Sequence, residues 1–405
     1  MIQLPSISPD RIAIKVKTSV EKIIRQGHPW LFEQGITKQS KEGKAGDIAI
    51  IYDKKKNQFL AIGLYDPFSV IRVKLLQAGK KAQIGEDWFR ERIKIAFDKR
   101  APLLQTDTNS YRLIHGENDG FPGLVADVYA NVLVLKLYAH IWLPYLSTIL
   151  PILKEYSQSE VGVLRLSRLL MRAPAHLHGL QDGQLLYGQL AQEWVQFKEH
   201  GLLFAANVIK GHKTGYFLDH RHNRKRVGEL AEGKKVLDVF AYAGGFSVHA
   251  LAGGARAVTS LDISAQALEM AKQNVQLNFP KANHQTMAID AFEGLMELHE
   301  TGKKFDLVIV DPPSFAKKES EIKKALHSYA RLAKLAIQIV AKGGILLLAS
   351  CSSRVSAEEF FKTATDSVQK SGRKYQEMER SLHDVDHPIG FKEGVYLKSI
   401  YFLLD

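Results

Sequence analysis

Apolar side chains occur along this chain in short runs, and the spacing of these runs changes from one stretch to the next. In the first 85 residues, strand-length runs at 11–17, 48–52, 60–65 and 70–73 are separated by polar turns. Residues 11–17 alternate apolar and polar side chains, which is typical of a half-buried strand. The pattern predicts a small all-β barrel or sandwich at the N-terminus.

The middle of the chain mixes two periodicities. Residues 88–99 place apolar side chains at helical spacing, and 142–156 reads as a second helix that Pro151 interrupts. Between them, runs at 125–128 and 132–137 flank a short turn and predict a hairpin. An α+β domain is therefore expected here.

From residue 197 onward, buried-strand runs alternate with amphipathic helices. The strand candidates are 236–240, 257–261, 286–289, 306–310 and 345–349, and the clearest helical patterns cover 268–275 and 326–337. Such alternation predicts an α/β fold with parallel strands and helices on both faces of the sheet. The predicted domains are 1–85, 86–196 and 197–405.

Composition narrows the class of protein. The 405 residues are 45% hydrophobic and contain one cysteine, which excludes an intrachain disulfide and a cysteine-rich zinc site, so no metal is expected. No apolar run is long enough for a membrane span, and the N-terminus lacks the pattern of a signal peptide. We expect a cytoplasmic protein without a membrane partner.

The positive charge is concentrated at the N-terminus. The formal net charge is +12, and residues 1–85 hold 15 Lys and Arg against 7 Asp and Glu. A basic small module indicates a polyanion partner, because neutralising phosphates releases counterions. The alternative is a basic surface that only confers solubility.

A glycine-containing turn follows the strand at 236–240. Gly244 and Gly245 lack a Cβ, so the backbone can approach a ligand beyond the carboxyl ends of the strands. The turn lacks the G-x-G-x-x-G spacing of dinucleotide sites and has no Walker lysine. A tight turn without a ligand is the alternative.

Carboxylates follow or end successive strand candidates: Asp238, Asp262, Asp290 and Asp311. Asp262 stands about 20 residues past the glycines, where an acidic residue accepts ribose hydroxyls. Asp290 is placed to receive an adenine amino group. One such residue alone would more often be a helix cap, but the series favours an adenosyl ligand.

Two further segments predict chemistry at the same edge. In 311–315 (Asp-Pro-Pro-Ser-Phe), the prolines form a rigid elbow that holds Asp311 toward a flat substrate, on which Phe315 could stack. Cys351 follows the strand at 345–349 and is flanked by serines. A lone cysteine is usually buried packing, but this position favours a reactive thiol.

A thiol there suits one reaction. Carbon 5 of cytosine is too weak a nucleophile to take a methyl group until a thiolate adds to carbon 6 and makes the ring an enamine. A carboxyl group at ring nitrogen 3 stabilises the adduct, best if burial raises its pKa, and Asp311 is the candidate. A base within a helix must first be unstacked.

These residues resemble the bacterial large-subunit ribosomal RNA cytosine-5 methyltransferases over essentially the full length. The resemblance is most specific at 213–221, 242–246, 311–315 and 350–352, and extends to 27–32, 111–124 and 386–388. It implies a PUA-type RNA-binding domain, a central α+β domain and a class I (Rossmann-like) methyltransferase domain. S-adenosylmethionine would be the cofactor, and large-subunit ribosomal RNA the partner.

The resemblance also implies residue roles. Cys351 would be the nucleophile and Asp311 its catalytic carboxyl, with Phe217 and Arg221 at the methionine end of the cofactor. The cofactor-binding set would be Phe217, Arg221, Asp238, Ala241, Tyr242, Gly244, Asp262, Ile263, Asp290, Ala291 and Asp311. The RNA-binding set would be Arg25, His28, Trp30, Lys213, Pro312, Pro313 and Phe315.

The chain departs from the resemblance in two places. Many relatives have Thr where Ala243 stands, and more distant enzymes carry a second cysteine in the Asp311 motif. The base that removes the carbon 5 proton is therefore unassigned. The alternatives are a methyltransferase acting on an exocyclic base nitrogen without a thiol, and a non-catalytic RNA-binding assembly factor. The target nucleotide, naked RNA or assembly particle as substrate, and a monomer or homodimer all stay open.

Overall fold

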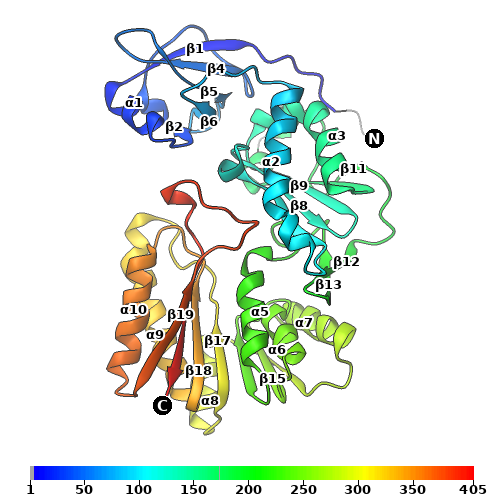
Figure 1. Cartoon of the computed structure of the whole chain (residues 1–405), viewed down its shortest axis with the longest axis vertical. Helices are drawn as coiled ribbons and strands as arrows, with labels where there is room; N and C mark the ends of the chain where they lie inside the picture. Colours follow the sequence, from blue (N-terminus) through cyan, green and yellow to red (C-terminus); the bar gives the residue numbers. More distant parts are fainter. Residues whose placement is uncertain (1–3, 173) are drawn as a thin grey trace. The chain divides into compact units, whose positions relative to one another are not determined.

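The chain folds into two compact units. The computed structural model describes residues 4–172 and 174–405. The first unit comprises Met1–Lys198, Ala206–Leu218 and Val385–Phe391, and the second comprises Glu199–Ala205, Asp219–Asp384 and Lys392–Asp405 (Figure 1). Of the two boundaries predicted, the one after residue 196 lies close to the first change of unit, and two later segments, Ala206–Leu218 and Val385–Phe391, belong to the first unit again. Among the described residues, no helix combines the length and hydrophobicity needed to span a bilayer.

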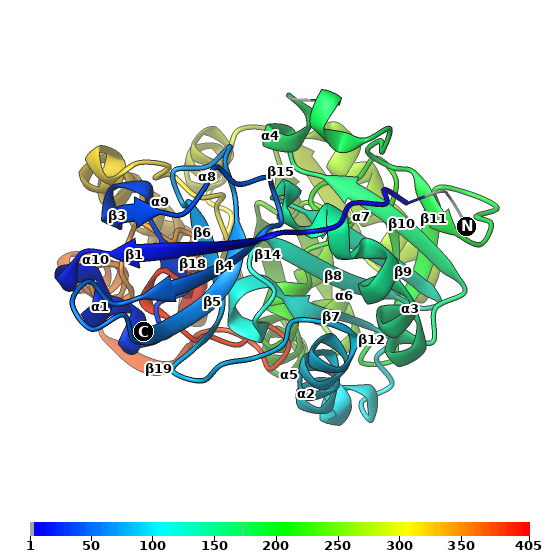
Figure 2. The ribbon, with the colours of Figure 1, turned by 90° about the horizontal axis from the view of Figure 1, so that it is seen from above.

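The N-terminal part of the first unit is built on a strongly bent sheet (Figure 2). Its strand order is β2-β6-β5-β4-β1-β3, with β1 Arg11–Val16, β2 Trp30–Leu31, β3 Ile36–Gln39, β4 Ile48–Tyr52, β5 Phe59–Tyr65 and β6 Val73–Ala78. Every second residue of β1 is buried, as its alternation predicts. A helix that the pattern did not predict, α1 Thr18–Arg25, packs against this sheet, and β6 begins only at Val73.

The rest of the first unit contains a second sheet with its own core. The order is β11-β10-β9-β8-β7, with β7 Ser110–His115, β8 Leu124–Tyr129, β9 Val132–Leu137, β10 Val161–Leu166 and β11 Leu185–Tyr187. The predicted hairpin is β8 and β9, which Ala130 joins at φ 53°. The helices are α2 Glu86–Leu104, α3 Leu146–Ser157 and α4 Arg168–Met171. Pro151 lies inside α3 and does not interrupt it, contrary to the prediction.

The chain first enters the second unit at the end of β12 Trp194–Glu199 and returns to the first unit within β13 Leu202–Asn207. The second unit is built on a sheet of order β16-β15-β14-β17-β18-β20-β19. Its strands are β14 Lys235–Val239, β15 Ala257–Asp262, β16 His284–Ala288, β17 Phe305–Val310, β18 Val340–Ser350, β19 Tyr375–Ser381 and β20 Lys398–Leu404. The strands from β16 to β18 are parallel as predicted, whereas β20 and β19 add an antiparallel edge.

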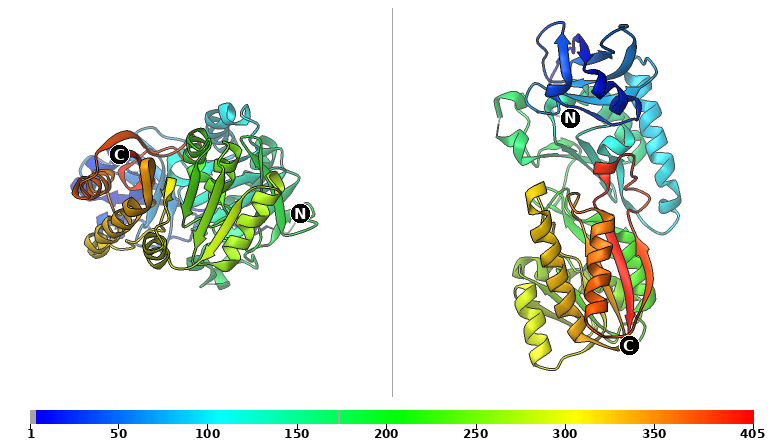
Figure 3. Two further views of the ribbon diagram at one scale, coloured as in Figure 1. Left: turned by 90° about the horizontal axis from the view of Figure 1, so that it is seen from below. Right: turned by 90° about the vertical axis from the view of Figure 1, so that its left-hand side faces the viewer.

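Helices cover both faces of this sheet (Figure 1, Figure 3). On one face α5 Arg221–Leu230 and α6 Gly245–Ala252 share a core with Val236 and Leu307, and α7 Ala265–Asn278 packs against α6. On the other, α8 Ala291–Glu300, α9 Ile322–Ile339 and α10 Ala357–Lys370 pack against Leu237 and Val308. Neighbouring strand residues thus enter opposite cores, which is why these strands are apolar throughout.

The strand order reverses between β14 and β17. These strands pair in parallel, with Val239 opposite Val310, so their carboxyl ends open side by side. In an open α/β sheet a crevice forms where successive connections leave in opposite directions. The site described next lies at this edge.

Candidate active site

The loop after β14 has an unusual backbone. Phe240, Tyr242 and Gly244 adopt positive φ angles of 66°, 48° and 73°. Left-handed conformations in two non-glycine residues store strain and are typical of functional loops. Gly244 is required, since a Cβ there would lie 3.0 Å from the Cα of Ala271. The strained turn lies at the carboxyl end of β14.

Side chains from neighbouring elements hold this loop. The Tyr242 amide donates to Asp262 Oδ2 at 2.9 Å, and Asn274 Nδ2 donates to the carbonyl of Ala243 at 2.9 Å. Ala241 is buried. Asp262 also accepts from the Ser264 amide through Oδ1 at 2.9 Å. The predicted ribose carboxylate is therefore oriented by the glycine loop itself.

The next two predicted cofactor positions differ in character. Ile263 is 73% exposed, so its side chain is accessible to a ligand. Asp290 is the N-cap of α8 and accepts from the Phe292 amide through Oδ1 at 2.9 Å. The capping alternative is therefore correct for Oδ1, while Oδ2 makes no hydrogen bond to the described residues. Ala291 behind it is buried.

Asp238 lies inside β14 and is 1% exposed. Its Oδ2 accepts from the amide and hydroxyl of Ser247, at 3.1 and 2.7 Å, while Oδ1 lacks a partner among the described residues. Burial raises the pKa of Asp238 to about 7, although the Ser247 hydroxyl opposes this shift. The side chain supports the loop from below and does not reach solvent.

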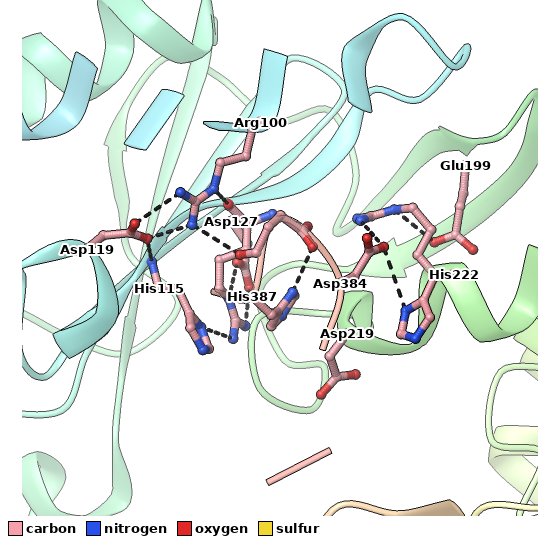
Figure 4. A network of polar contacts seen from close by, with 12 residues as sticks. Arg100, His115, Asp119, Asp127, Glu199, Asp219, His222, Asp384 and His387 are labelled. Carbon is pink, nitrogen blue, oxygen red and sulfur yellow. Dashed lines mark hydrogen bonds and ion pairs between the residues drawn. The ribbon is translucent and has the colours of Figure 1, made fainter. Parts of the chain in front are cut away.

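The segment around 213–221 is divided between the units. Lys213 and Phe217 are exposed and belong to the first unit. Arg221 belongs to the second, where it is fully buried and lies 3.2 Å from Asp384 and 3.7 Å from Glu199. Figure 4 shows the carboxylates of this cluster. The predicted roles of Phe217 and Arg221 at the methionine end stay predictions.

Asp311 follows β17 and faces a histidine that the sequence reading did not single out. His220 Nε2 lies 3.2 Å from Asp311 Oδ1, and their side chains are 6% and 22% exposed. Burial lowers the pKa of His220, but the carboxylate of Asp311 outweighs it and the net shift is upward. The two side chains are therefore close enough to form an ion pair at the strand ends when His220 is protonated.

A buried amide fixes the His220 ring. Asn223 Nδ2 lies 3.1 Å from His220 Nδ1 and also donates to Ser399 Oγ at 3.1 Å. Asn223 Oδ1 accepts from Ser381 Oγ and Tyr401 Oη, at 2.7 and 3.0 Å. With its amide oriented this way, Asn223 donates to Nδ1, which places the ring proton of neutral His220 on Nε2, toward Asp311.

The nucleophile candidate lies next to the proline elbow. Cys351 directly follows β18, is half-buried, and donates through Sγ to the carbonyl of Pro312 at 3.6 Å. Pro312 is buried and Pro313 exposed. Phe315 packs on Tyr329 with ring centroids 5.1 Å apart, so one of its faces is already occupied. The thiol is therefore beside the Asp311 motif and not sealed in the core.

A buried lysine lies under the same turn. Lys398 Nζ donates to the carbonyls of Ser352 and Val355. Neither Lys398 nor His220 was predicted as a site residue. The signal for Lys398 was a charged residue inside the apolar C-terminal run, and that for His220 its place within 213–221.

The predicted RNA-binding residues of the N-terminus surround an aromatic cluster. Trp30 contacts the rings of His28 and Phe391 edge-on, with centroids 5.6 and 5.1 Å apart. Trp30 Nε1 donates to Glu117 Oε1 at 3.0 Å. Arg25 is exposed at the end of α1. The position of these residues is compatible with RNA contact, which stays a prediction.

The segments 111–124 and 386–388 meet within the first unit. Arg100 forms a bidentate ion pair with Asp119, at 3.0 and 2.5 Å, and donates to the carbonyl of Asp386 (Figure 4). Asp386 accepts from the Arg112 amide and lies 2.8 Å from His387 Nδ1. These segments build an ion-pair core in the first unit and not the strand-end site.

The geometry so far is a strained glycine loop beside carboxylates and a thiol at a strand-end crevice. A family model described as S-adenosylmethionine-dependent methyltransferase matches residues 112–396. The chain belongs to this family. A model of PUA-like domains matches residues 14–78 of the chain. The methyltransferase therefore has an α/β fold preceded by a PUA-like domain, which confirms the predicted fold class and cofactor.

Two relatives match over nearly their full lengths. The chain is 45% identical to a ribosomal RNA large subunit methyltransferase of Deinococcus radiodurans, covering 99% of both chains. It is 35% identical to ribosomal RNA large subunit methyltransferase I of Aeromonas salmonicida, covering 94% of this chain and 96% of that one. These names support the coarser part of the resemblance and do not specify the methylated atom.

Solved structures agree on the fold. A protein of Streptococcus mutans assigned as a SAM-dependent methyltransferase superposes with a TM-score of 0.80 at 21% identity, covering 96% of this chain and 99% of that chain. SMU.776, assigned as a methyltransferase and complexed with S-adenosylhomocysteine, gives a TM-score of 0.81, also at 21% identity, with 97% and 100% covered. At that identity the likeness concerns the fold alone.

Proposed function

We propose that this methyltransferase forms 5-methylcytosine in large-subunit ribosomal RNA, with Cys351 as covalent nucleophile. The observation that carries the proposal is the position of the thiol. Cys351 lies at the end of β18, is half-buried, and contacts Pro312 of the Asp311 motif at 3.6 Å. A methyltransferase acting on an exocyclic amine needs no thiol there. The names of the relatives support ribosomal RNA as the substrate.

The cofactor would be held along the ends of β14, β15 and β16. Asp262 would accept the ribose hydroxyls with its remaining lone pairs, and Asp290 the adenine amino group through Oδ2. Ile263 would gain an apolar partner, and Gly244, whose missing Cβ lets the loop pack against Ala271, would contribute its backbone. The remaining residues proposed for this site are Phe217, Arg221, Asp238, Ala241, Tyr242, Ala291 and Asp311. Bound S-adenosylmethionine supplies an electrophilic methyl group.

The covalent sequence would use the thiolate of Cys351, the methyl group of the cofactor and one base. The thiolate of Cys351 adds to carbon 6, and the electron pair of the 5,6 double bond shifts toward carbon 5. Carbon 5 takes the methyl group, and S-adenosylhomocysteine is released. A base then removes the carbon 5 proton, and expulsion of the thiolate restores the aromatic ring. The products are 5-methylcytosine, S-adenosylhomocysteine and one proton.

Asp311 and His220 would manage the charge on the ring. As the thiolate adds, negative charge develops at ring nitrogen 3, which a proton shared by these two side chains can neutralise. Because Asn223 orients His220, the Nε2 proton faces Asp311. Asp311 then presents its second oxygen to the base. The group that removes the carbon 5 proton is left unassigned.

RNA would contact the residues of the predicted RNA-binding set, which lie in the PUA-like domain and at the catalytic edge. The basic PUA-like domain, with Arg25, His28 and Trp30, would contact the RNA backbone and unpaired bases. At the catalytic edge, Pro312 and Pro313 would form a rigid wall for an unstacked cytosine, and the free face of Phe315 would stack on it. Exposed Lys213 would contact a phosphate.

The test is nucleoside mass spectrometry on ribosomal RNA after incubation with enzyme and labelled S-adenosylmethionine. The expected product is labelled 5-methylcytidine from wild type. Cys351→Ala should lose at least about 10³-fold in methyl transfer, because no thiolate can activate carbon 5, while calorimetry shows unchanged cofactor binding. The wild-type enzyme, incubated with RNA that contains 5-fluorocytosine, should form a covalent adduct that survives denaturation.

Other outcomes would reject the proposal. A label on an exocyclic nitrogen, with full activity in Cys351→Ala, would identify an amino-directed methyltransferase. Cofactor binding without transfer to any ribosomal RNA would instead favour the non-catalytic RNA-binding alternative.

A further inference from the structure

Lys398 is a buried cation directly beside the proposed nucleophile. It lies in β20 opposite Ser350 of β18, the residue before Cys351, and it is 0% exposed. Its ammonium donates to the carbonyls of Ser352 and Val355, at 2.5 and 2.6 Å. The lysine therefore holds the turn that begins with Cys351 through these two hydrogen bonds.

This cation lacks the partner that a buried charge normally requires. In the part of the chain that the structure describes, no carboxylate lies within ion-pair distance of Lys398. Burial lowers the pKa of Lys398 to about 8, although the nearby thiol of Cys351 and the carboxylate of Glu359 oppose this. Two carbonyls satisfy hydrogen bonds but do not neutralise a charge, and unpaired buried charges are costly.

We propose that the ammonium of Lys398 stabilises the thiolate of Cys351 and so keeps the nucleophile ready for attack on the base. The inference rests on the proposed function of Cys351 and assigns Lys398 a positioning and charge-balancing role. A thiolate is the reactive form of cysteine, and cations nearby increase its population. In this arrangement the missing counter-ion of Lys398 is the nucleophile itself.

The other charged or titratable groups around the thiol favour this pairing. Glu359 of α10 is already held in a capping box by the amide and hydroxyl of Ser356. Tyr329 of α9 stays neutral, because burial raises its pKa to about 12. Asp311, which adjoins Pro312, would disfavour a second negative charge beside it. Lys398 is the group that offsets this repulsion from below.

A purely structural role makes a different prediction. If Lys398 only ties the carbonyls of Ser352 and Val355, a neutral donor of similar length should replace it. If its charge matters, a neutral donor should fail as badly as an apolar side chain. Lys398→Gln keeps a donor, whereas Lys398→Met removes it, so the pair separates hydrogen bonding from charge.

The experiment uses the full chain, whose single cysteine makes any thiol signal a report on Cys351. Thiolate absorbance near 240 nm and the rate of iodoacetamide alkylation are followed against pH, without RNA. We expect the wild-type thiol to titrate clearly below the ordinary pKa of about 8.5. Both variants should titrate roughly one unit or more higher and alkylate about tenfold more slowly at pH 7.

Controls separate this effect from general damage. Lys362→Met removes the same charge from an exposed position on α10, where Lys362 pairs with Asp366, and should leave the thiol pKa unchanged. Calorimetry with S-adenosylmethionine checks that each variant keeps its fold. If both Lys398 variants unfold, the wild-type titration still decides, because a thiol pKa at or above about 8.5 would overturn the inference.

The inference and the proposed function fail in different ways. If Lys398→Gln titrates like wild type while Cys351→Ala is inactive, the lysine is structural and Cys351 keeps its role. If the thiol pKa depends on Lys398 but Cys351→Ala methylates RNA normally, the ion pair exists and the cytosine mechanism is wrong.

Discussion

Two fully buried cations, one in each unit, are treated in opposite ways. In the first unit, Arg100 pairs with Asp119 through two hydrogen bonds and uses its remaining donors on the carbonyls of Ala96, Arg112 and Asp386. In the second, Lys398 has carbonyl partners alone among the described residues. One charge is neutralised within the fold, and the other is not.

The difference shows that the first unit neutralises this buried charge, whereas the second unit bears the free-energy cost of burying a charge without a carboxylate partner. A neutralised buried pair holds its segments together, and here it fixes 386–388 to α2 and the loop after β7. An incompletely paired charge destabilises the native state and is therefore expected at sites that need it for chemistry. The second unit has another such group at the same edge, since Asp238 Oδ1 is buried without a partner.

The largest expected effect comes from breaking the neutral pair. Arg100→Met should lower the free energy of unfolding of the first unit by about 3 kcal/mol, because buried Asp119 would lose its bidentate partner and keep, among the described residues, only Lys99 Nζ, 3.6 Å away, as a cation. Urea unfolding followed by tryptophan fluorescence measures it. The matched double variant, Arg100→Met with Asp119→Leu, should recover much of the loss. Equal loss in the single and double variants would mean that the pair matters through packing alone.

A smaller effect is expected from Asp238, and it depends on pH. Its folded-state pKa of about 7 lies above the value of 3.8 for an unperturbed Asp, so the folded chain keeps a proton that the unfolded chain releases. Between about pH 4 and 7 the unfolded state therefore gains relative stability as pH rises, by at most about 1.4 kcal/mol per pH unit.

Asp238→Asn mimics the protonated side chain and keeps an acceptor for Ser247. The variant should show a flatter dependence of unfolding free energy on pH across that window, with the gain over wild type largest near pH 7. Urea titrations at pH 4.5, 5.5 and 7 measure this. Parallel curves for both proteins would show that Asp238 is ionised throughout.

The sequence predicted the sheet of the second unit well because its strands are buried on both sides. Runs such as 307–310 and 345–349 are apolar throughout, and Asp311 and Cys351 come after them at the edge where the parallel strands open. Cys351 and Asp311 could be singled out for the same reason. The absence of a hydrogen-bond partner for Asp238 Oδ1 could not be predicted, because such partners depend on packing between distant segments.

Elsewhere, tertiary contacts decided what local patterns could not. Helix α1 has only eight residues, Thr18–Arg25, which is too short a stretch for its apolar positions to be distinguished from a strand or a loop. Pro151 lies within α3, where packing of Ile149 and Leu153 outweighs the lost hydrogen bond. His220 was visible as part of a motif, but its role required the fold to bring it to Asp311 across 91 positions.

The smallest expected effect concerns His220, which forms an ion pair with Asp311 only while its ring is protonated. Its pKa is raised, so its proton is present below that pKa and lost as pH rises through it. If this proton serves ring nitrogen 3, methyl transfer should decline on the alkaline side of that pKa. His220→Leu removes the donor to Asp311 and should reduce kcat by about 10²-fold, with little change in KM for the cofactor.

His220→Gln is the matched control, because its amide can donate to Asp311 and accept from Asn223 but does not titrate in this range. It should recover much of the activity lost in His220→Leu and show no alkaline decline from residue 220. A purely structural histidine would change stability in both variants and leave the shape of the pH profile intact. Single-turnover methyl transfer between pH 6 and 9 distinguishes these outcomes, since it isolates the chemical step from product release. An alkaline decline that persists unchanged in His220→Gln would assign the proton to another group, and Lys398, whose pKa lies at about 8, would then be the first to examine.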